Sequence, residues 1–227
     1  MNSYKLEKLE SALMLGNQKY YSEFNTTVHG NSLEPGSMPA DGLYEYWMQT
    51  YKPDIVIEVG SFLGYSAIKM ANEVRRLNLQ TKIICVDTWL GSPEHYIMHK
   101  GSNDNRLGYL HGYPTMYHKF ISNVILHGNK DIINPFPFPS TVAAKILNKI
   151  FTELELRADF IFLDGSHEES DVFFDCVNYF PLLRNGGVMW GDDWGWSGVE
   201  SAVTRFAKEN ELTLNVLQNK VHWFIQK

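Results

Sequence analysis

Carboxylate side chains follow several short apolar runs of the sequence, where β-strands would end. They are Glu58, Asp87, Asp164 and the adjacent pair Asp192–Asp193. A single acid in such a place commonly caps a helix or closes a turn. Five acids at successive strand ends would instead make one anionic rim, which repels phosphate and attracts a cationic ligand, a hydroxyl-rich ligand or a divalent metal ion.

A histidine, His167, follows Asp164 by three residues. Imidazole titrates near neutral pH, so it is suited to take a proton from a substrate hydroxyl. Two other interpretations stay open: His167 packs against or caps a local turn, or it binds a metal ion together with Asp164. We treat His167 and Asp164 as the candidate catalytic residues.

Two glycines, Gly60 and Gly64, lie just after the first apolar run. A glycine-rich turn between a strand and a helix usually holds a phosphate group, but pyrophosphate binding needs the spacing Gly-x-Gly-x-x-Gly. Here the spacing is Glu-x-Gly-x-x-x-Gly, which suits a ligand without pyrophosphate. Asp87, after the second run, occupies the usual position of the acceptor for ribose hydroxyls. A positively charged nucleoside without phosphate fits this set, and S-adenosylmethionine is such a molecule.

A parallel sheet would bring these residues together. From residue 53 onward, short apolar runs alternate with amphipathic helical patterns, which predicts a doubly wound, Rossmann-like α/β fold with a mostly parallel, seven-stranded sheet. Two β-type runs near the end predict a C-terminal antiparallel hairpin. Ligands of such sheets bind beyond the carboxyl ends of the strands. The expected strands are 54–59, 82–87, 131–136, 159–164 and 188–193, and the expected helices are 65–77, 115–128, 140–151, 168–183 (stopped by the glycines of 184–187) and 197–209.

Length and composition predict one compact domain, with residues 1–45 as an N-terminal helical and loop cover and 46–227 as the main body. The net charge of -6 argues against a nucleic-acid-binding surface. No apolar run approaches the roughly 18 residues of a membrane span. We therefore expect no nucleic-acid partner, no membrane contact and a cytoplasmic location, and a homo-oligomer stays open. Cys85 and Cys176 lie in apolar stretches, which predicts buried free thiols.

The segment "VIEVGSFLGYSAIKMA" (56–71) resembles the first motif of class I methyltransferases, in particular the catechol O-methyltransferase-like group. The resemblance implies that S-adenosylmethionine is the methyl donor. Gly60 and Ser66 would line its methionine end, Glu58 would organise the turn, Asp87 would bind the ribose and Ser140 would contact the adenine. Ser61 and Asp164 complete the expected cofactor-binding set.

The segments "FLDGSHEE" and "WGDDW" resemble the metal-binding part of the same group. The resemblance implies that Asp164, Asp192 and Asp193 hold Mg²⁺, which carboxylate oxygens and water suit. The alternative is that Asp192 and Asp193 only cap a turn. The catechol enzymes have a lysine as general base where this sequence has His167, so the base here would be an imidazole.

The pair "VDTWLGSPEHY" and "GDDWGW" also resembles sugar and macrolide O-methyltransferases of the macrocin type. Trp89, Trp194 and Trp196 would then form the aromatic walls of an acceptor pocket, unless they pack in the core. The leading hypothesis is a Mg²⁺-dependent O-methyltransferase acting on a hydroxyl of a small molecule, sugar or glycan. The alternatives are a cofactor-binding relative without this chemistry and a nicotinamide-dependent oxidoreductase.

Overall fold

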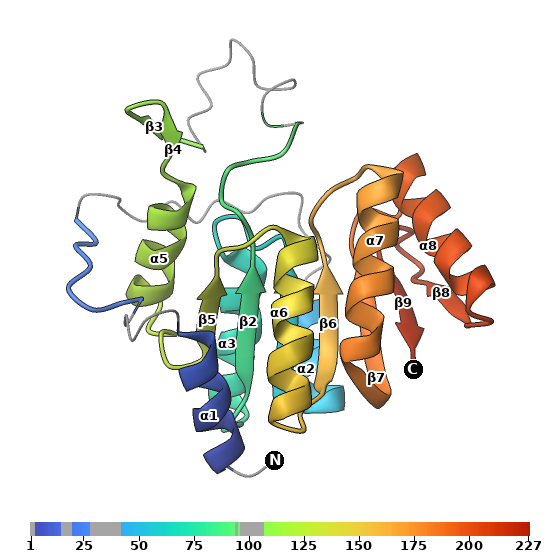
Figure 1. Cartoon of the computed structure of the whole chain (residues 1–227), viewed down its shortest axis with the longest axis horizontal. Coiled ribbons are helices and arrows are strands. Elements are labelled where there is room, and N and C mark those ends of the chain that lie inside the picture. The colour runs from blue at the N-terminus through green and yellow to red at the C-terminus, as the bar shows by residue number, and fades with distance from the viewer. Residues whose placement is uncertain (1–2, 15–19, 28–41, 94, 96–106) are drawn as a thin grey trace.

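One seven-stranded sheet organises the chain, for which the computed structural model describes residues 3–14, 20–27, 42–93, 95 and 107–227. The strand order is β5-β2-β1-β6-β7-β9-β8. The first five strands in this order are parallel, and β9 runs antiparallel to both β7 and β8 (Figure 1). The strands are β1 (Ile55–Val59), β2 (Lys82–Val86), β5 (Ile133–Phe136), β6 (Ala158–Leu163), β7 (Leu183–Gly191), β8 (Leu214–Val216) and β9 (Trp223–Gln226). The predicted fold class, including the C-terminal hairpin, is confirmed.

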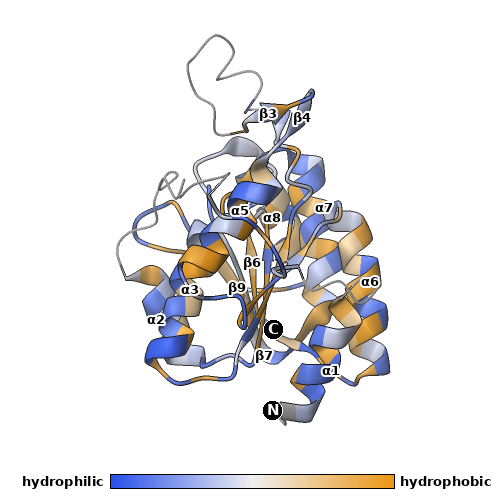
Figure 2. Cartoon of the chain, turned by 90° about the vertical axis from the view of Figure 1, so that its left-hand side faces the viewer, coloured by the Kyte–Doolittle hydropathy of each residue, from blue (hydrophilic) through white to orange (hydrophobic). Residues whose placement is uncertain are grey.

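Helices cover both faces of this sheet. One buried apolar cluster joins one face to α1 (Ser3–Leu13), α6 (Ser140–Glu153), α7 (Glu169–Tyr179) and α8 (Ser197–Glu209). A second cluster joins the other face to α2 (Leu43–Tyr51), α3 (Tyr65–Arg76) and α5 (Met116–Leu126). Figure 2 shows the mostly hydrophobic strands between the two helical layers. Because strand side chains alternate between faces, both layers are needed to bury them.

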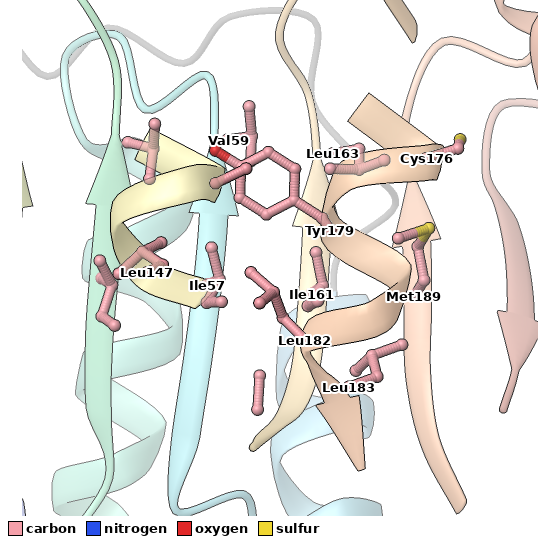
Figure 3. Packing of buried hydrophobic residues seen from close by; sticks show 14 of the residues in the cluster. Ile57, Val59, Leu147, Ile161, Leu163, Cys176, Tyr179, Leu182, Leu183 and Met189 are labelled. Carbon is pink, nitrogen blue, oxygen red and sulfur yellow. The ribbon is translucent and has the colours of Figure 1, made fainter. Parts of the chain in front are cut away.

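The first cluster fixes the helices that reach the carboxyl ends of the central strands. Tyr179 of α7 lies among Val59, Leu163 and other apolar side chains of β1 and β6 (Figure 3). Its hydroxyl donates a hydrogen bond to the carbonyl of Ser140, 3.0 Å away. This contact ties the start of α6 to the end of α7, so both helices hold a fixed position beside the strand ends.

The N-terminal helix lies at the opposite end of the sheet. Glu10 of α1 pairs with Lys82, the first residue of β2, at 2.9 Å. The predicted boundary at residue 45 falls inside α2, whose Trp47 and Met48 are buried against the sheet. Residues 28–41, on which much of the predicted cover depends, lie outside the described residues. The division of the chain at residue 45 stays a prediction.

Two local features differ from the expected elements. The glycines of 184–187 lie inside β7 rather than after the preceding helix, which ends in a short 3₁₀ turn, η2 (Phe180–Leu182). A small hairpin of β3 (Tyr109–Leu110) and β4 (Tyr113–Pro114) stands apart from the main sheet, in the segment between β2 and α5, where no strand was expected (Figure 1). Much of that segment, residues 94 and 96–106, lies outside the described residues.

Both cysteines are buried free thiols, as predicted. In the part of the chain that the structure describes, the helices lack the combination of length and apolar character that a membrane crossing requires.

Candidate active site

A cavity of about 680 Å³ opens at the carboxyl ends of β1, β2, β5 and β6. This is the size of a pocket for a small organic ligand. Six of the predicted site residues line it: Gly60, Asp87, Ser140, Asp164, His167 and Asp193. The sheet therefore brings together residues that are far apart in the sequence, because parallel strands all end at the same edge.

The turn between β1 and α3 passes against the end of β6. Gly60 has φ +89°, and a Cβ atom there would lie 2.0 Å from the carbonyl oxygen of Asp164. Gly64, also at φ +89°, is the N-cap of α3. Only glycine adopts such a conformation without strain, and only glycine leaves room for the neighbouring backbone. The glycine spacing in the sequence thus reflects a close contact between the two strand ends.

Glu58 does not reach the cavity, so its predicted place on an open acidic rim is wrong. It lies within β1 on the face that turns toward α3, and it is fully buried. Its carboxylate accepts a hydrogen bond from Ser66 Oγ at 2.5 Å and one from the Cys85 thiol at 3.4 Å. Burial raises the pKa of Glu58, and these hydrogen bonds oppose the rise. The geometry suits the predicted role of Glu58 in organising the turn.

Two serines at this turn, Ser61 within it and Ser66 in the first turn of α3, are also buried. Ser66 uses its hydroxyl for Glu58, and Ser61 is only 2% exposed. The carbonyl of Ser61 accepts a hydrogen bond from the Gly64 amide at 2.7 Å, which closes the turn. Neither serine side chain lines the large cavity, so their predicted contacts with a cofactor stay predictions.

Asp87 lies at the cavity edge after β2. Its two carboxylate oxygens accept hydrogen bonds from the backbone amides of Phe62 and Trp89, at 2.8 and 2.7 Å. Burial raises the pKa of Asp87, and the amide donors work against this rise. The carboxylate is therefore held rigidly at the cavity wall, bridging the turn after β1 and the loop after β2.

Ser140 lines the same cavity at the first turn of α6 and hydrogen-bonds through Oγ to Asp175 of α7. Asp175 also lines the cavity, and burial raises its pKa to about 7. The sequence analysis did not select Asp175, because it is an internal position of a helix. The sequence did hold one signal that could have identified Asp175. A carboxylate near the apolar stripe of an amphipathic helix is partly buried and needs a hydrogen-bonding partner.

The carboxylates of Asp164, Asp192 and Asp193 gather where β6 and β7 end. One carboxylate oxygen from each lies within 4.8 Å of those of the other two. Burial, together with the neighbouring Asp192 and Asp193, raises the pKa of Asp164 well above its usual value. Burial and Asp193 raise the pKa of Asp192 to about 6. Such a set of close, hard oxygen donors fits a divalent cation, which would relieve their mutual repulsion.

His167 lies directly beside this carboxylate cluster. Its Nε2 is 2.8 Å from Asp193 Oδ2. Its ring stacks on the indole of Trp196, with the ring centres 4.3 Å apart. The histidine thus has a fixed ring orientation at the border between the large cavity and the cluster.

The three tryptophans expected to form pocket walls have different environments. Trp89 is 1% exposed and packs against Tyr117 and Phe120, so its assignment to the pocket is wrong. Trp194 is partly buried against the core between sheet and α8. Trp196 is 43% exposed and faces His167, so it alone of the three presents a ring surface beside the site.

His222 lies behind the cluster and was not selected from the sequence. It is fully buried, stacks on Trp190, and places Nε2 3.2 Å from Asp192 Oδ1. Burial lowers its pKa to about 4. Its only signal was a histidine within the apolar run "VHWFI", which does not indicate that its partner is Asp192, the residue after β7.

The family match agrees with this geometry. Residues 57–194 match the model of a family described as a methyltransferase domain. This stretch covers β1 to the end of β7 and contains Asp87, Ser140, His167 and the carboxylate cluster. The chain belongs to this methyltransferase family, and the predicted class I methyltransferase is confirmed. No curated protein sequence matches the chain.

Solved structures with the same fold include three O-methyltransferases of low sequence identity. A candidate O-methyltransferase from Klebsiella pneumoniae is 16% identical, with a TM-score of 0.61 over 97% of this chain and 94% of that one. An O-methyltransferase from Bacillus cereus, in complex with SAH, is 16% identical, with a TM-score of 0.56 over 100% and 92%. TomG from Streptomyces achromogenes, involved in tomaymycin synthesis and in complex with SAM, is 14% identical, with a TM-score of 0.58 over 99% and 94%. At these identities the likeness concerns the fold.

Proposed function

We propose that this methyltransferase uses S-adenosylmethionine to methylate a hydroxyl group of a small molecule, sugar or glycan, with Mg²⁺ bound at the carboxylate cluster. The proposal rests on one observation: the cavity and the carboxylate cluster meet at a shared edge. A cavity of about 680 Å³ for the methyl donor shares Asp164 and Asp193 with a cation-binding edge, and His167 lines the cavity directly beside that edge. A donor and an ionisable acceptor would meet at that shared edge.

The donor end of the cavity supports a nucleoside ligand. Asp87 is held at the wall by two amide donors, and its carboxylate is the natural acceptor for ribose hydroxyls. Ser140 lies at the far wall, where the resemblance implies an adenine contact. The positive sulfonium of S-adenosylmethionine would be attracted by the acidic edge formed by Asp164 and Asp193.

The carboxylate cluster supports the metal part of the proposal. Asp164, Asp192 and Asp193 would hold the cation with oxygen ligands. Bound there, Mg²⁺ supplies Lewis acidity that lowers the pKa of a coordinated hydroxyl. The protein's own part is to hold these three carboxylates close together at the edge of the donor cavity, so that the acceptor oxygen and the methyl group are oriented toward each other.

His167 is the proposed general base. Nε2 lies 2.8 Å from Asp193 Oδ2, whereas Nδ1 is buried, so we assign Nε2 as the nitrogen that accepts the proton. Once His167 has accepted a proton, the Asp193 carboxylate at 2.8 Å stabilises the resulting imidazolium. The stack on Trp196 keeps the ring from rotating away. Proton transfer to His167 would therefore accompany attack by the acceptor oxygen on the methyl group.

Titration with the donor and its demethylated product tests the first part of the proposal. We expect low-micromolar binding of S-adenosylmethionine and S-adenosylhomocysteine, about -7 to -8 kcal/mol. Asp87→Ala should weaken both by about 1.5–3 kcal/mol, because a charge-assisted ribose contact is lost. Calorimetry on folded protein measures both quantities. The absence of binding heat with either compound would exclude the proposed donor.

Transfer of a labelled methyl group to a panel of catechols, sugars, nucleotide-sugars and glycans tests the second part. We expect product with at least one hydroxyl acceptor, and we expect excess chelator to remove it. A cofactor-binding relative without this chemistry would bind the donor and transfer nothing. A nicotinamide oxidoreductase would instead bind NAD, which the glycine spacing disfavours.

Substitution of His167 tests the base. Turnover of the wild type should rise between about pH 6 and 8, as the imidazole becomes available to accept a proton. His167→Ala should lower turnover by about 10²–10⁴ and flatten this rise. His127→Ala, at the exposed end of α5, is the control and should leave the profile unchanged. A retained pH profile in His167→Ala would assign ionisation of the hydroxyl to the metal alone.

A further inference from the structure

The C-terminal hairpin places a histidine directly behind one ligand of the proposed cation site. His222 precedes β9, which pairs with β7 so that Trp223 lies opposite Gly191. This register puts the ring of His222 against Trp190, with Nε2 3.2 Å from Oδ1 of Asp192. The atoms are close enough for a hydrogen bond but lack its alignment. The nature of this contact depends on which ring nitrogen carries the proton.

Asn219 decides which nitrogen of this ring carries the proton. Its Oδ1 accepts hydrogen bonds from the backbone amides of Val221 and His222, at 3.0 and 3.3 Å. These two donors fix the orientation of the side-chain amide, so its NH₂ group faces Nδ1 of His222 at 2.8 Å. An amide nitrogen only donates, so Nδ1 is the acceptor. The ring is therefore neutral, with its single proton on Nε2, the atom that faces Asp192.

Asp192 in turn is held through the same oxygen. Its Oδ1 accepts a hydrogen bond from the Asp193 amide at 2.8 Å, in addition to facing His222. Two positive partners at Oδ1 orient the carboxylate and leave Oδ2 for a cation. Outer partners of this kind set the orientation of ligating side chains and the affinity of a metal site.

We propose that His222, held in its Nε2–H form by Asn219, is a positioning residue that orients Asp192 for cation binding. This inference rests on the proposed metal site. It assigns a part in that site to the turn 217–222, which follows the residues matched by the family model.

Cation affinity and donor affinity together test the proposal. Mn²⁺, followed by electron paramagnetic resonance, replaces Mg²⁺ as the probe. His222→Phe keeps the stack on Trp190 but removes the N–H, and should weaken Mn²⁺ binding about 10-fold or more. His222→Gln, which retains a side-chain N–H, should recover part of the loss. In the absence of a cation, the affinity for S-adenosylhomocysteine should not change in either variant, and His127→Phe controls for adventitious binding to a surface imidazole.

Measuring the tautomer of His222 in the wild type is a second test, and this test does not require a variant to fold. Nitrogen-15 spectra of the wild type should show the Nε2–H form, and Asn219→Leu should shift the ring toward a mixture of the two forms. An Nδ1–H form in the wild type would overturn the proposal. Unchanged Mn²⁺ affinity in folded His222→Phe would do the same. Normal binding of S-adenosylhomocysteine without any Mn²⁺ binding would overturn the metal part of the proposed function and this inference with it, while leaving the donor site intact.

Discussion

Replacing Gly60 with alanine should abolish donor binding and destabilise the whole domain. The new Cβ atom would lie 2.0 Å from the carbonyl oxygen of Asp164, and the residue would keep φ +89°, which is strained for any side chain. The ends of β1 and β6 would have to separate. We expect a loss of roughly 2–5 kcal/mol of unfolding free energy from overpacking and backbone strain together. Thermal unfolding and calorimetric titration with S-adenosylhomocysteine measure the two effects.

A second glycine separates the steric effect from the backbone effect. Gly128 also has positive φ, +72°, but a Cβ atom there meets nothing within 4 Å. Gly128→Ala should therefore cost only the conformational part, about 1–2 kcal/mol, and leave donor binding intact. Equal effects of the two substitutions on donor binding would show that the contact between Gly60 and Asp164 is unimportant to the cavity.

Asp192 should contribute a fall in the stability of the cation-free protein as the pH rises from 4 to 7. Burial and Asp193 raise the folded-state pKa of Asp192 to about 6, above its value in the unfolded chain. A raised pKa means that the folded state holds its proton longer, so the stabilisation is complete at low pH and is lost as pH passes through 6. A shift of about two units corresponds to at most about 3 kcal/mol. The lowered pKa of His222 acts in the opposite direction over the same range, so the difference in melting temperature between the wild type and Asp192→Asn, measured in a chelator, tests the sign.

Mg²⁺ should reverse this loss, and the reversal should depend on Asp192. At pH 7.5 the cation should raise the melting temperature, and at pH 5 it should raise it less, because protons compete for the same oxygens. Asp192→Asn should flatten the pH dependence, remove the effect of Mg²⁺ and reduce turnover to its level in excess chelator. Asp131→Asn, an exposed surface acid, is the control. Full turnover of Asp192→Asn would make the cluster purely structural.

The order of the elements was predictable because the sheet is made of short apolar runs separated by clear helices. The meeting of Asp164, Asp192 and Asp193 followed from the same rule, since parallel strands end at one edge. The direction of Glu58 was not predictable in this way. Residues of β1 are apolar on both faces of a doubly covered sheet, so the pattern does not reveal which face an acid in the strand will take.

Other parts of the site depend on contacts that sequence spacing does not encode. Asp175 and His222 have their partners on different elements, at Ser140 and Asp192. Trp89 was expected in the acceptor pocket, but a backbone turn at φ +53° directs its ring into the core. The glycines before Val188 signal a turn locally, whereas pairing with β6 across a bulge keeps them in β7. In each of these positions tertiary contacts outweigh local preference.

The wall that the donor cavity shares with the carboxylate cluster has a thermodynamic consequence. Asp164 and Asp193 belong to both, and His167 lies beside them. The Asp164 amide donates a hydrogen bond to the Val59 carbonyl at 2.8 Å, just ahead of the donor turn. A ligand that moves this wall changes the free energy of donor binding in the cavity and the free energy of cation binding at the cluster. Linkage then requires the factor by which the cation alters donor affinity to equal the factor by which the donor alters cation affinity. If the proposed donor and cation both bind here, the affinity measured for either one therefore reports on the other.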